Sequence, residues 1–347
     1  MSDRELTYVE AVREATEQEM ERDGSVVVFG LDVDDPKAIQ GTTRGLAERY
    51  GPERVFGTPL SEDAMTGVAV GMSLAGLRPI HVHIRMDFLL LAMNQLVNIA
   101  AKARYMYGGQ VRLPMVVRSI IGRSWGQGAQ HSQGLHSLFM HTPGLRVVAP
   151  ADPHDAKGCL AQAIRMDDPV IFVEHRLLYP LRGRVPAQSY VVPAGAGRVR
   201  REGRDVTLVG ISHMVTECSR AAALLAKGGI EAELIDPVWL APLDVRLIVE
   251  SVRRTRRLCV VDTAWLNCGA SAEIVARVAE ALSDGPPLRF RRLGHAASPC
   301  PPAPTLEALY YPDARRIAAV AYELVTGRAD WEPGRPADAD PEMEGPF

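Results

Sequence analysis

Residues 205–236, which read DVTLVGISHMVTECSRAAALLAKGGIEAELID, decide the fold class of the chain. A short apolar run at Val206–Ile211 precedes a segment with helical spacing of apolar residues at Val215–Lys227, and a second strand-like run follows at Glu233–Asp236. Apolar runs without polar alternation are typical of strands covered on both faces of a parallel sheet. The stretch therefore predicts a strand–helix–strand unit of an α/β protein.

The same alternation occupies most of the chain. Further strands are expected at residues 25–31, 54–56, 78–84, 115–119, 146–149, 169–174, 258–262 and 288–293. Residues 88–107 have a helix-forming composition and predict a helix. Residues 183–203 interrupt the pattern with prolines and glycines. We therefore predict an α/β fold with two doubly wound parallel-sheet domains, residues 1–185 and 204–328, joined by a linker at 186–203. The tail, residues 329–347, is rich in proline and acidic residues and is expected to be an extended arm or a disordered end.

Composition excludes several classes of protein. The 347 residues are 47% hydrophobic with a net charge of −3, so most of the chain is expected to fold. With 39 basic and 42 acidic residues, the chain has no overall attraction for nucleic acid. No apolar stretch approaches the roughly 20 residues that cross a membrane, and the amino terminus lacks an apolar signal core. The five scattered cysteines are expected to be buried free thiols, which favours the reducing cytoplasm.

One carboxylate stands out in the sequence. Glu62 begins a stretch, residues 62–74, whose Ala, Val, Gly and Met content predicts a buried helix. A carboxylate that enters an apolar helix is costly unless it is paired or functional. Two interpretations are open: a structural carboxylate that complements the helix dipole, or a functional acid.

Histidines and an arginine form a second group of candidates. His81, His83 and Arg85 occupy alternate positions of one expected strand, and so lie on one face. An HxH pair of this kind binds metal in some proteins, but a hydrogen-bonded pair in a pocket is commoner. His131 belongs to the sequence QHSQ at residues 130–133, which closes a glycine-rich loop. No phosphate-loop motif GxxxxGK[ST] and no HExxH zinc motif occurs.

Longer motifs carry a resemblance to a known family. They are residues 58–71, 75–79, 98–110, 130–133, 141–148 and 155–158 in the first half, and 236–237, 241–244 and 269–274 in the second. In this order and spacing they resemble the β subunits of thiamine-diphosphate-dependent 2-oxo acid dehydrogenases. This is the E1 β family of pyruvate, branched-chain 2-oxo acid and acetoin dehydrogenases, and the resemblance covers about residues 5–325.

The resemblance implies a transketolase-like architecture. Residues 1–185 would form a thiamine-diphosphate pyrimidine-binding domain, and residues 204–328 a transketolase C-terminal domain. Glu62 matches the family's catalytic glutamate, whose carboxyl group hydrogen-bonds N1′ of the aminopyrimidine and so promotes loss of the thiazolium C2 proton. Phe88 matches the aromatic residue that stacks on the pyrimidine.

Two further cofactor contacts are implied by the resemblance. Leu60 falls where the family offers a main-chain contact to the pyrimidine ring. His131 matches the histidine that faces the thiazolium end and assists proton transfer or transfer of the bound intermediate. The main-chain carbonyls of Ala163, Met166 and Asp168 match a structural potassium site of the family.

A partner subunit is implied by what the sequence lacks. Thiamine-diphosphate enzymes hold the diphosphate through Mg²⁺ on a GDG motif followed by an asparagine, and no GDG occurs here. The chain is therefore expected to hold only the pyrimidine half of the cofactor. By resemblance, an α subunit would hold Mg²⁺ and the diphosphate in an α2β2 heterotetramer, and a lipoyl-bearing E2 or carrier protein would be a further partner.

Departures from the family bear on the substrate. The family's Gly-Glu-Asp after the first strand is Gly30-Leu31-Asp32 here, and its Asp-Thr-Pro before the catalytic helix is Gly57-Thr58-Pro59. A negative charge is lost, and basic side chains occupy a strand that is usually acidic or apolar. This predicts an anionic substrate, or else pairing of these groups with the partner subunit. The candidate substrate contacts are His81, His83, Arg85 and Gln133.

Three functions remain as hypotheses. The first is an E1 β subunit that decarboxylates a 2-oxo acid and passes the acyl unit to a lipoyl group. The second is a transketolase-like transfer of a two-carbon ketol unit from a phosphosugar, and release of CO₂ separates these two. The third is a non-catalytic scaffold, against which the joint presence of Glu62, Phe88 and His131 argues.

Overall fold

The computed structural model describes residues 4–35, 37–123 and 126–336. The chain divides into two compact units. The first consists of Met1–Ile121 and Leu138–Ala194, and the second of Gly122–Ser137 and Gly195–Phe347. Each unit contains a mostly parallel sheet with helices on both faces, so the predicted fold class is confirmed.

The sheet of the first unit contains six parallel strands in the order β6-β7-β5-β4-β2-β3. Their bounds are β2 Val26–Gly30, β3 Val55–Gly57, β4 Arg78–His83, β5 Val116–Ile121, β6 Arg146–Val148 and β7 Val170–His175. Every residue of β2, β5 and β7 is buried, which explains their continuous apolar sequences. Because all six strands are parallel, their carboxyl ends lie at one edge of the sheet.

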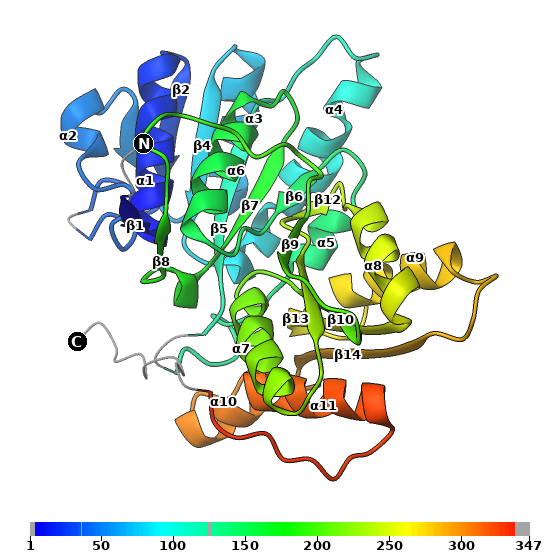
Figure 1. The fold of residues 1–347 in the computed structure, drawn as a ribbon. Coiled ribbons are helices and arrows are strands. Elements are labelled where there is room, and N and C mark those ends of the chain that lie inside the picture. The colour runs from blue at the N-terminus through cyan, green and yellow to red at the C-terminus, as the bar shows by residue number, and fades with distance from the viewer. Residues whose placement is uncertain (1–3, 36, 124–125, 337–347) are drawn as a thin grey trace. The chain divides into compact units, whose positions relative to one another are not determined.

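Helices cover both faces of this sheet (Figure 1). On one face α1, Tyr8–Arg22, packs against α6, Pro153–Arg165. The helix α3, Glu62–Leu74, packs against β4 and lies on the opposite face, because its crossover runs in the opposite direction along the sheet. The shorter elements are β1 Glu5–Thr7, α2 Leu46–Tyr50, α5 His136–Met140, η3 Arg176–Leu178 and β8 Arg182–Arg184.

The segment that follows β4 differs from the prediction of a helix at residues 88–107. It consists of the 3₁₀ helix η1, Met86–Ala92, the π-helix η2, Asn94–Ala100, and the short α4, Ala101–Met106. The wide π turn keeps Leu96 and Ala100 buried while Asn94 and Asn98 remain exposed. A single helical period cannot describe this change of phase.

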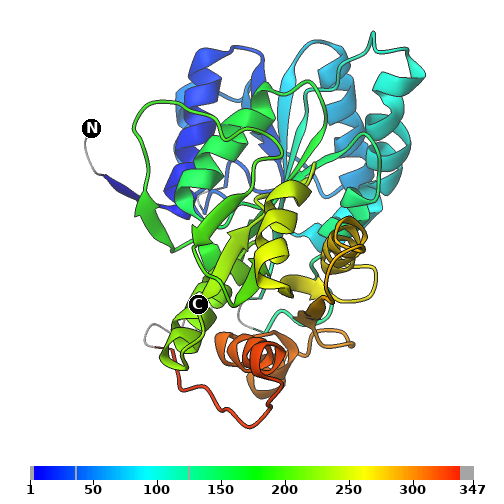
Figure 2. The same cartoon turned by 45° about the vertical axis from the view of Figure 1, so that its right-hand side comes forward.

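The sheet of the second unit has the order β14-β13-β10-β11-β9, in which β9 is antiparallel to β11 and the other neighbouring strands are parallel. Its strands are β9 Arg198–Arg201, β10 Val206–Gly210, β11 Ala232–Asp236, β13 Arg257–Trp265 and β14 Arg289–His295. Figure 2 shows its helices: α7, Met214–Lys227, packs against α11, Ala314–Thr326, and α8, Val245–Thr255, packs against α9, Ala270–Ala281. The smaller elements are β12 Trp239–Ala241 and α10 Pro304–Tyr310. The predicted strand–helix–strand unit is therefore present as β10, α7 and β11.

Three boundary regions differ from the predicted organisation. The strand β9 lies inside the segment 186–203, which was expected to be a linker. Residues 122–137, expected in the first domain, group with the second unit because they contact β13. Residues 337–347 of the expected arm lie outside the described residues, whereas Trp331 stacks on Tyr322 of α11 with ring centres 4.7 Å apart.

The structure bears on two expectations from the sequence, one about membrane spans and one about the cysteines. Among the described residues, no helix combines the length and the apolar character that a membrane span requires. All five cysteines are free, and four of them are buried. Cys268 is exposed, because it lies in the turn between β13 and α9 rather than in a sheet or helix, so the expectation of five buried thiols is wrong for this residue.

A buried ion pair joins two central strands of the first unit. Arg118 of β5 donates from Nε and Nη2 to the two carboxylate oxygens of Glu174 of β7, at 2.7 and 2.9 Å, and both side chains are fully buried. The hydroxyl of Tyr179 also donates to Glu174, at 3.1 Å. The two charges therefore compensate each other inside an apolar sheet.

Removal of one partner should destabilise the protein more than removal of both. Arg118→Met leaves the Glu174 carboxylate buried without its counter-ion, which should lower the free energy of unfolding by about 3–5 kcal/mol. The double variant Arg118→Met/Glu174→Leu should recover most of this loss, as measured by urea unfolding. A double variant no more stable than the single one would contradict this explanation.

Candidate active site

Glu62 is the first residue of α3 and is partly buried. Within the described residues, the preceding Ser61 makes no side-chain capping bond, so Glu62 and Asp63 alone place negative charge at the start of the helix. The expectation that α3 is buried is wrong for this chain, because Val68 is 41% exposed and Leu74 is 56% exposed. One side of α3 therefore exposes apolar side chains in this chain alone.

Leu60 and Phe88 lie on segments close to α3. Leu60, two residues before Glu62, is 74% exposed, so its backbone lies at the surface of the chain. Phe88 is partly buried in η1, and η1 packs directly against α3. The structure thus places an accessible carboxyl and an aromatic ring on two elements that contact each other.

His81 and His83 are buried at the end of β4. The His81 ring stacks on Phe29 with centres 4.6 Å apart, and the His83 ring meets His81 edge-on at 4.3 Å. Nε2 of His83 lies 3.4 Å from the hydroxyl oxygen of Thr66, one turn after Glu62 on α3. His83 therefore links β4 to the helix that carries Glu62.

Burial decides the charge of these two histidines. It lowers the pKa of His81 to about 4, although a hydrogen bond to the Phe29 carbonyl opposes the shift. Burial, and then the neighbouring His81, hold the pKa of His83 well below its usual value. Both rings are neutral at pH 7, so the expectation that they add positive charge for an anionic substrate is wrong for these two residues.

Arginines supply positive charge at the carboxyl edge of the first sheet. Arg85, which follows β4, is 3% exposed, and its Nε lies 3.7 Å from the Asp87 carboxylate. Arg176 follows β7 and is 4% exposed. Burial, and then the nearby Arg85 guanidinium, lower the pKa of Arg176 to about 10, so it stays protonated at pH 7. Two cationic groups are therefore close together where parallel sheets usually bind ligands.

Gln40 contacts Arg176 from the loop that follows β2. With its amide oxygen facing the guanidinium, Gln40 accepts hydrogen bonds from Nη2 at 2.8 Å and from Nε at 3.2 Å. Ala38, Ile39 and Gln40 all have φ between 48° and 59°. Three successive non-glycine residues in the left-handed region are costly, and such strain concentrates at functional sites.

Arg176 and Gln40 were not among the site residues predicted from the sequence. Arg176 could have been found, because it comes two residues after the strand expected at 169–174 and so lies at the edge where parallel sheets bind ligands. No sequence signal identifies Gln40, since a left-handed turn without glycine is not readable from residue types.

His131 and Gln133 lie on the segment 122–137, which belongs to the second unit. Both side chains are partly buried, and Ser132 between them is fully buried. The structure therefore brings Leu60, Glu62, His83 and Phe88 onto neighbouring elements of the first unit. It places His131 and Gln133 on the second unit.

The residues expected to bind potassium make other contacts. The carbonyl of Ala163 accepts from the Met166 N–H at 3.3 Å. The carbonyl of Met166 accepts from Nη1 of Arg78 at 3.0 Å. The carboxylate of Asp168 accepts a hydrogen bond from Arg104 at 2.7 Å. Burial would raise the pKa of this carboxyl, but its hydrogen bonds with Arg104 and Arg146 lower it. The potassium site stays a prediction.

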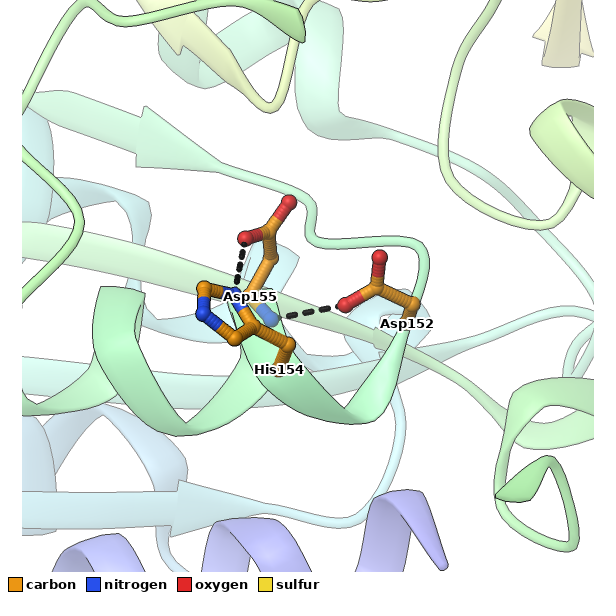
Figure 3. A group of neighbouring side chains, drawn as sticks. All are labelled: Asp152, His154 and Asp155. Atoms are coloured by element: carbon orange, nitrogen blue, oxygen red, sulfur yellow. Dashed lines mark hydrogen bonds and ion pairs between the residues drawn. The ribbon is translucent and has the colours of Figure 1, made fainter. Parts of the chain in front are cut away.

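Two aspartates and a histidine, Asp152, Asp155 and His154, lie close together at the start of α6 (Figure 3). Their possible ligand atoms lie within 4.8 Å of one another. Asp152 accepts a hydrogen bond from the Asp155 N–H at 2.7 Å, and Nδ1 of His154 lies 2.9 Å from the Asp155 carboxylate. We assign Asp152 to capping of α6, because its carboxylate accepts the N–H of Asp155 in the first turn.

Acid sensitivity should report the neutral state of His81. The unfolded chain binds a proton near the ordinary histidine pKa of about 6.5, whereas folded His81 binds it near pH 4. The stability contributed by the neutral ring is thus present above pH 6.5 and is lost as the pH falls toward 4. His81→Phe should reduce the loss of unfolding free energy between pH 7 and 4.5 by about 2 kcal/mol.

Urea unfolding at the two pH values measures this difference. His141→Phe is the control, because His141 is exposed. Equal acid sensitivity of wild type and His81→Phe would show that His81 is not held neutral.

Both units of the chain are similar to known protein families. Residues 4–182 match the family described as transketolase, pyrimidine binding domain, and residues 195–317 match transketolase, C-terminal domain. The chain is 43% identical over 334 residues to an acetoin:2,6-dichlorophenolindophenol oxidoreductase subunit beta of Cupriavidus necator, covering 93% of this chain and 98% of that protein. It is 39% identical to a mitochondrial pyruvate dehydrogenase E1 component subunit beta-1 of Arabidopsis thaliana, covering 90% and 88%.

A solved structure shares the fold. It is described as a split gene transketolase, inactive beta4 tetramer, and aligns with a TM-score of 0.75 at 24% identity, covering 92% of this chain and 98% of that one. At this identity the likeness concerns the fold alone.

Proposed function

This chain belongs to the transketolase-like family of E1 β subunits, and we propose that it forms the β half of a thiamine-diphosphate-dependent 2-oxo acid dehydrogenase. The enzyme would decarboxylate a 2-oxo acid and transfer the acyl unit to a lipoyl acceptor. The observation that carries this proposal is the placement of Glu62 at the head of α3, against the segment η1 that holds Phe88.

The residues present fit the pyrimidine half of the cofactor. Glu62 offers a partly exposed carboxyl that would exchange a proton with a ring nitrogen, and Phe88 offers a face for stacking. The exposed Leu60 backbone would complete the contact. When bound, thiamine diphosphate supplies the nucleophilic carbon and the electron sink for decarboxylation. His131 would hold or deliver a proton at the substrate.

A second subunit is needed for the diphosphate half. The sequence has no GDG motif for Mg²⁺. Apolar residues remain exposed on and beside α3, η1 and α4: Leu60 at 74%, Leu74 at 56%, Leu91 at 61%, Tyr105 at 91% and Met106 at 64%. Exposed apolar residues on contacting elements mark an interaction surface. We propose that an α subunit covers them in an α2β2 assembly, and that a lipoyl-bearing protein is the acceptor.

The cysteines bear on the cellular compartment in which the protein works. All five are free thiols, four of them buried, which supports a reducing compartment, and we propose the cytoplasm.

Loss of the Glu62 carboxyl should abolish turnover without preventing assembly. This chain would be co-expressed with a candidate α-type chain, and native mass spectrometry would measure the assembly in Mg²⁺ and thiamine diphosphate. Glu62→Gln should retain the α2β2 mass but lower CO₂ release from 2-oxo acids at least ~100-fold. Asp63→Asn is the control, since Asp63 is an exposed neighbour on the same turn. Unchanged turnover in Glu62→Gln would favour the scaffold hypothesis.

A second candidate is ketol transfer from a phosphosugar, as in transketolases. Arg85 and Arg176 are both buried, and Gln40 accepts hydrogen bonds from Arg176. These two positive charges favour binding of a substrate that carries an additional anionic group. A phosphosugar has such a group, and so does a 2-oxo acid with a second carboxylate. Release of CO₂ distinguishes the two reactions.

Arg176 should discriminate substrates by charge. Arg176→Met should raise the KM for substrates with a second anionic group by roughly 10-fold or more, because a charge-assisted hydrogen bond is lost, and should leave the KM for pyruvate unchanged. Arg112→Met is the control, because 70% of the Arg112 side chain is exposed. An equal effect on both substrate classes would contradict an anion-binding role.

A further inference from the structure

The loop that carries His131 is held closely against other parts of the second unit. A Cβ at Gly126, where φ is +69°, would lie 2.6 Å from the carbonyl oxygen of Pro302. A Cβ at Gly134 would lie 2.1 Å from the carbonyl oxygen of Thr263 on β13. Since no side chain fits in either space, glycine is required for these contacts. The loop is therefore attached to the same unit on both sides of His131.

A buried histidine–aspartate pair follows the second attachment point. Nε2 of His136 lies 3.0 Å from Oδ1 of Asp262 on β13, and both side chains are fully buried. Oδ2 of Asp262 and Nδ1 of His136 have no hydrogen-bond partner among the described residues. His136 thus makes a direct polar contact with a buried carboxylate, and the buried His295 lies near the same pair.

Ser132, the residue that follows His131, is anchored in the second unit. It is fully buried, and its hydroxyl lies beside the Cys300 thiol and the Tyr311 hydroxyl. The ring of Tyr311 also lies under the Arg123 guanidinium, with 5.4 Å between Cζ and the ring centre. These contacts hold the first part of the loop, so the His136–Asp262 contact fixes the remaining end.

We infer that His136 is a positioning residue, whose bond to Asp262 sets where the His131 imidazole lies. The inference rests on the proposed function, because it takes His131 as the group that acts on the substrate. Misplacement of a reacting group by about 1 Å can cost about 100-fold in rate, so a bond made five residues along the same loop is enough to affect turnover. No family motif in the sequence includes Asp262.

Hydrogen exchange on the full chain tests the attachment without any substrate. His136→Ala should speed amide exchange in the peptide 126–137 about 10-fold or more, and His136→Gln, which keeps a donor for Asp262, should restore protection. Thr207→Val is the matched control, because it removes buried hydroxyl contacts to Ser251 and Thr255 in the same unit, at 2.6 and 2.8 Å. Unchanged exchange in His136→Ala would overturn the inference.

One further variant, Asp262→Asn, keeps the test informative. If His136→Ala does not fold, Asp262→Asn replaces it, since the amide retains one oxygen acceptor but loses the charge. This variant should give a smaller increase in exchange of the same peptide. Protection equal to wild type in Asp262→Asn would likewise overturn the inference.

Turnover in the complex with the α-type subunit tests the positioning role. His136→Ala should lower kcat about 10- to 100-fold with KM changed less than about 3-fold, and His136→Gln should recover kcat. Thr207→Val should change neither constant. Faster loop exchange with an unchanged kcat would overturn the positioning role. If the wild-type complex releases no CO₂ from 2-oxo acids, the proposed function fails. If His131→Ala turns over as fast as wild type, the role of His131 fails and the positioning role of His136 fails with it. In either case the exchange result still decides the attachment.

Discussion

Strands buried on both faces limit where this chain can place polar groups. Every residue of β2, β5 and β7 is buried, and an unpaired charge inside such a sheet is strongly unfavourable. Arg118 and Glu174 are tolerated there because they neutralise each other. Gln40, Glu62 and Arg176 instead follow the carboxyl ends of β2, β3 and β7. The first unit thus concentrates its reactive groups at one edge of the sheet.

Local pattern was sufficient to predict most strands of the two parallel sheets but not the contacts between distant residues. The run from Val206 to Asp236 predicts β10, α7 and β11, because burial and helical period leave a direct record in the sequence. Glu62 was singled out as a candidate for the same reason, as a polar residue at the start of an apolar stretch. The pair of His136 with Asp262 joins residues 126 positions apart, and no local signal records it.

Charge and exposure were the properties that residue type predicted least well. His81 and His83 looked like sources of positive charge, but burial keeps both rings neutral. The apolar composition of α3 looked like that of a core helix, yet Leu74 and Val68 remain exposed. An interface and a core have similar composition, so one chain's sequence cannot separate a helix that its own fold buries from one that a partner covers.

The strand β14 lies at the edge of the second sheet and presents exposed Arg289 and Arg291. An open strand edge has unpaired backbone groups that can recruit another edge and start aggregation. Two such edges would bring arginines of like charge face to face, which is unfavourable. The basic sequence of β14 therefore disfavours edge-to-edge pairing of this strand between copies of the chain at high concentration.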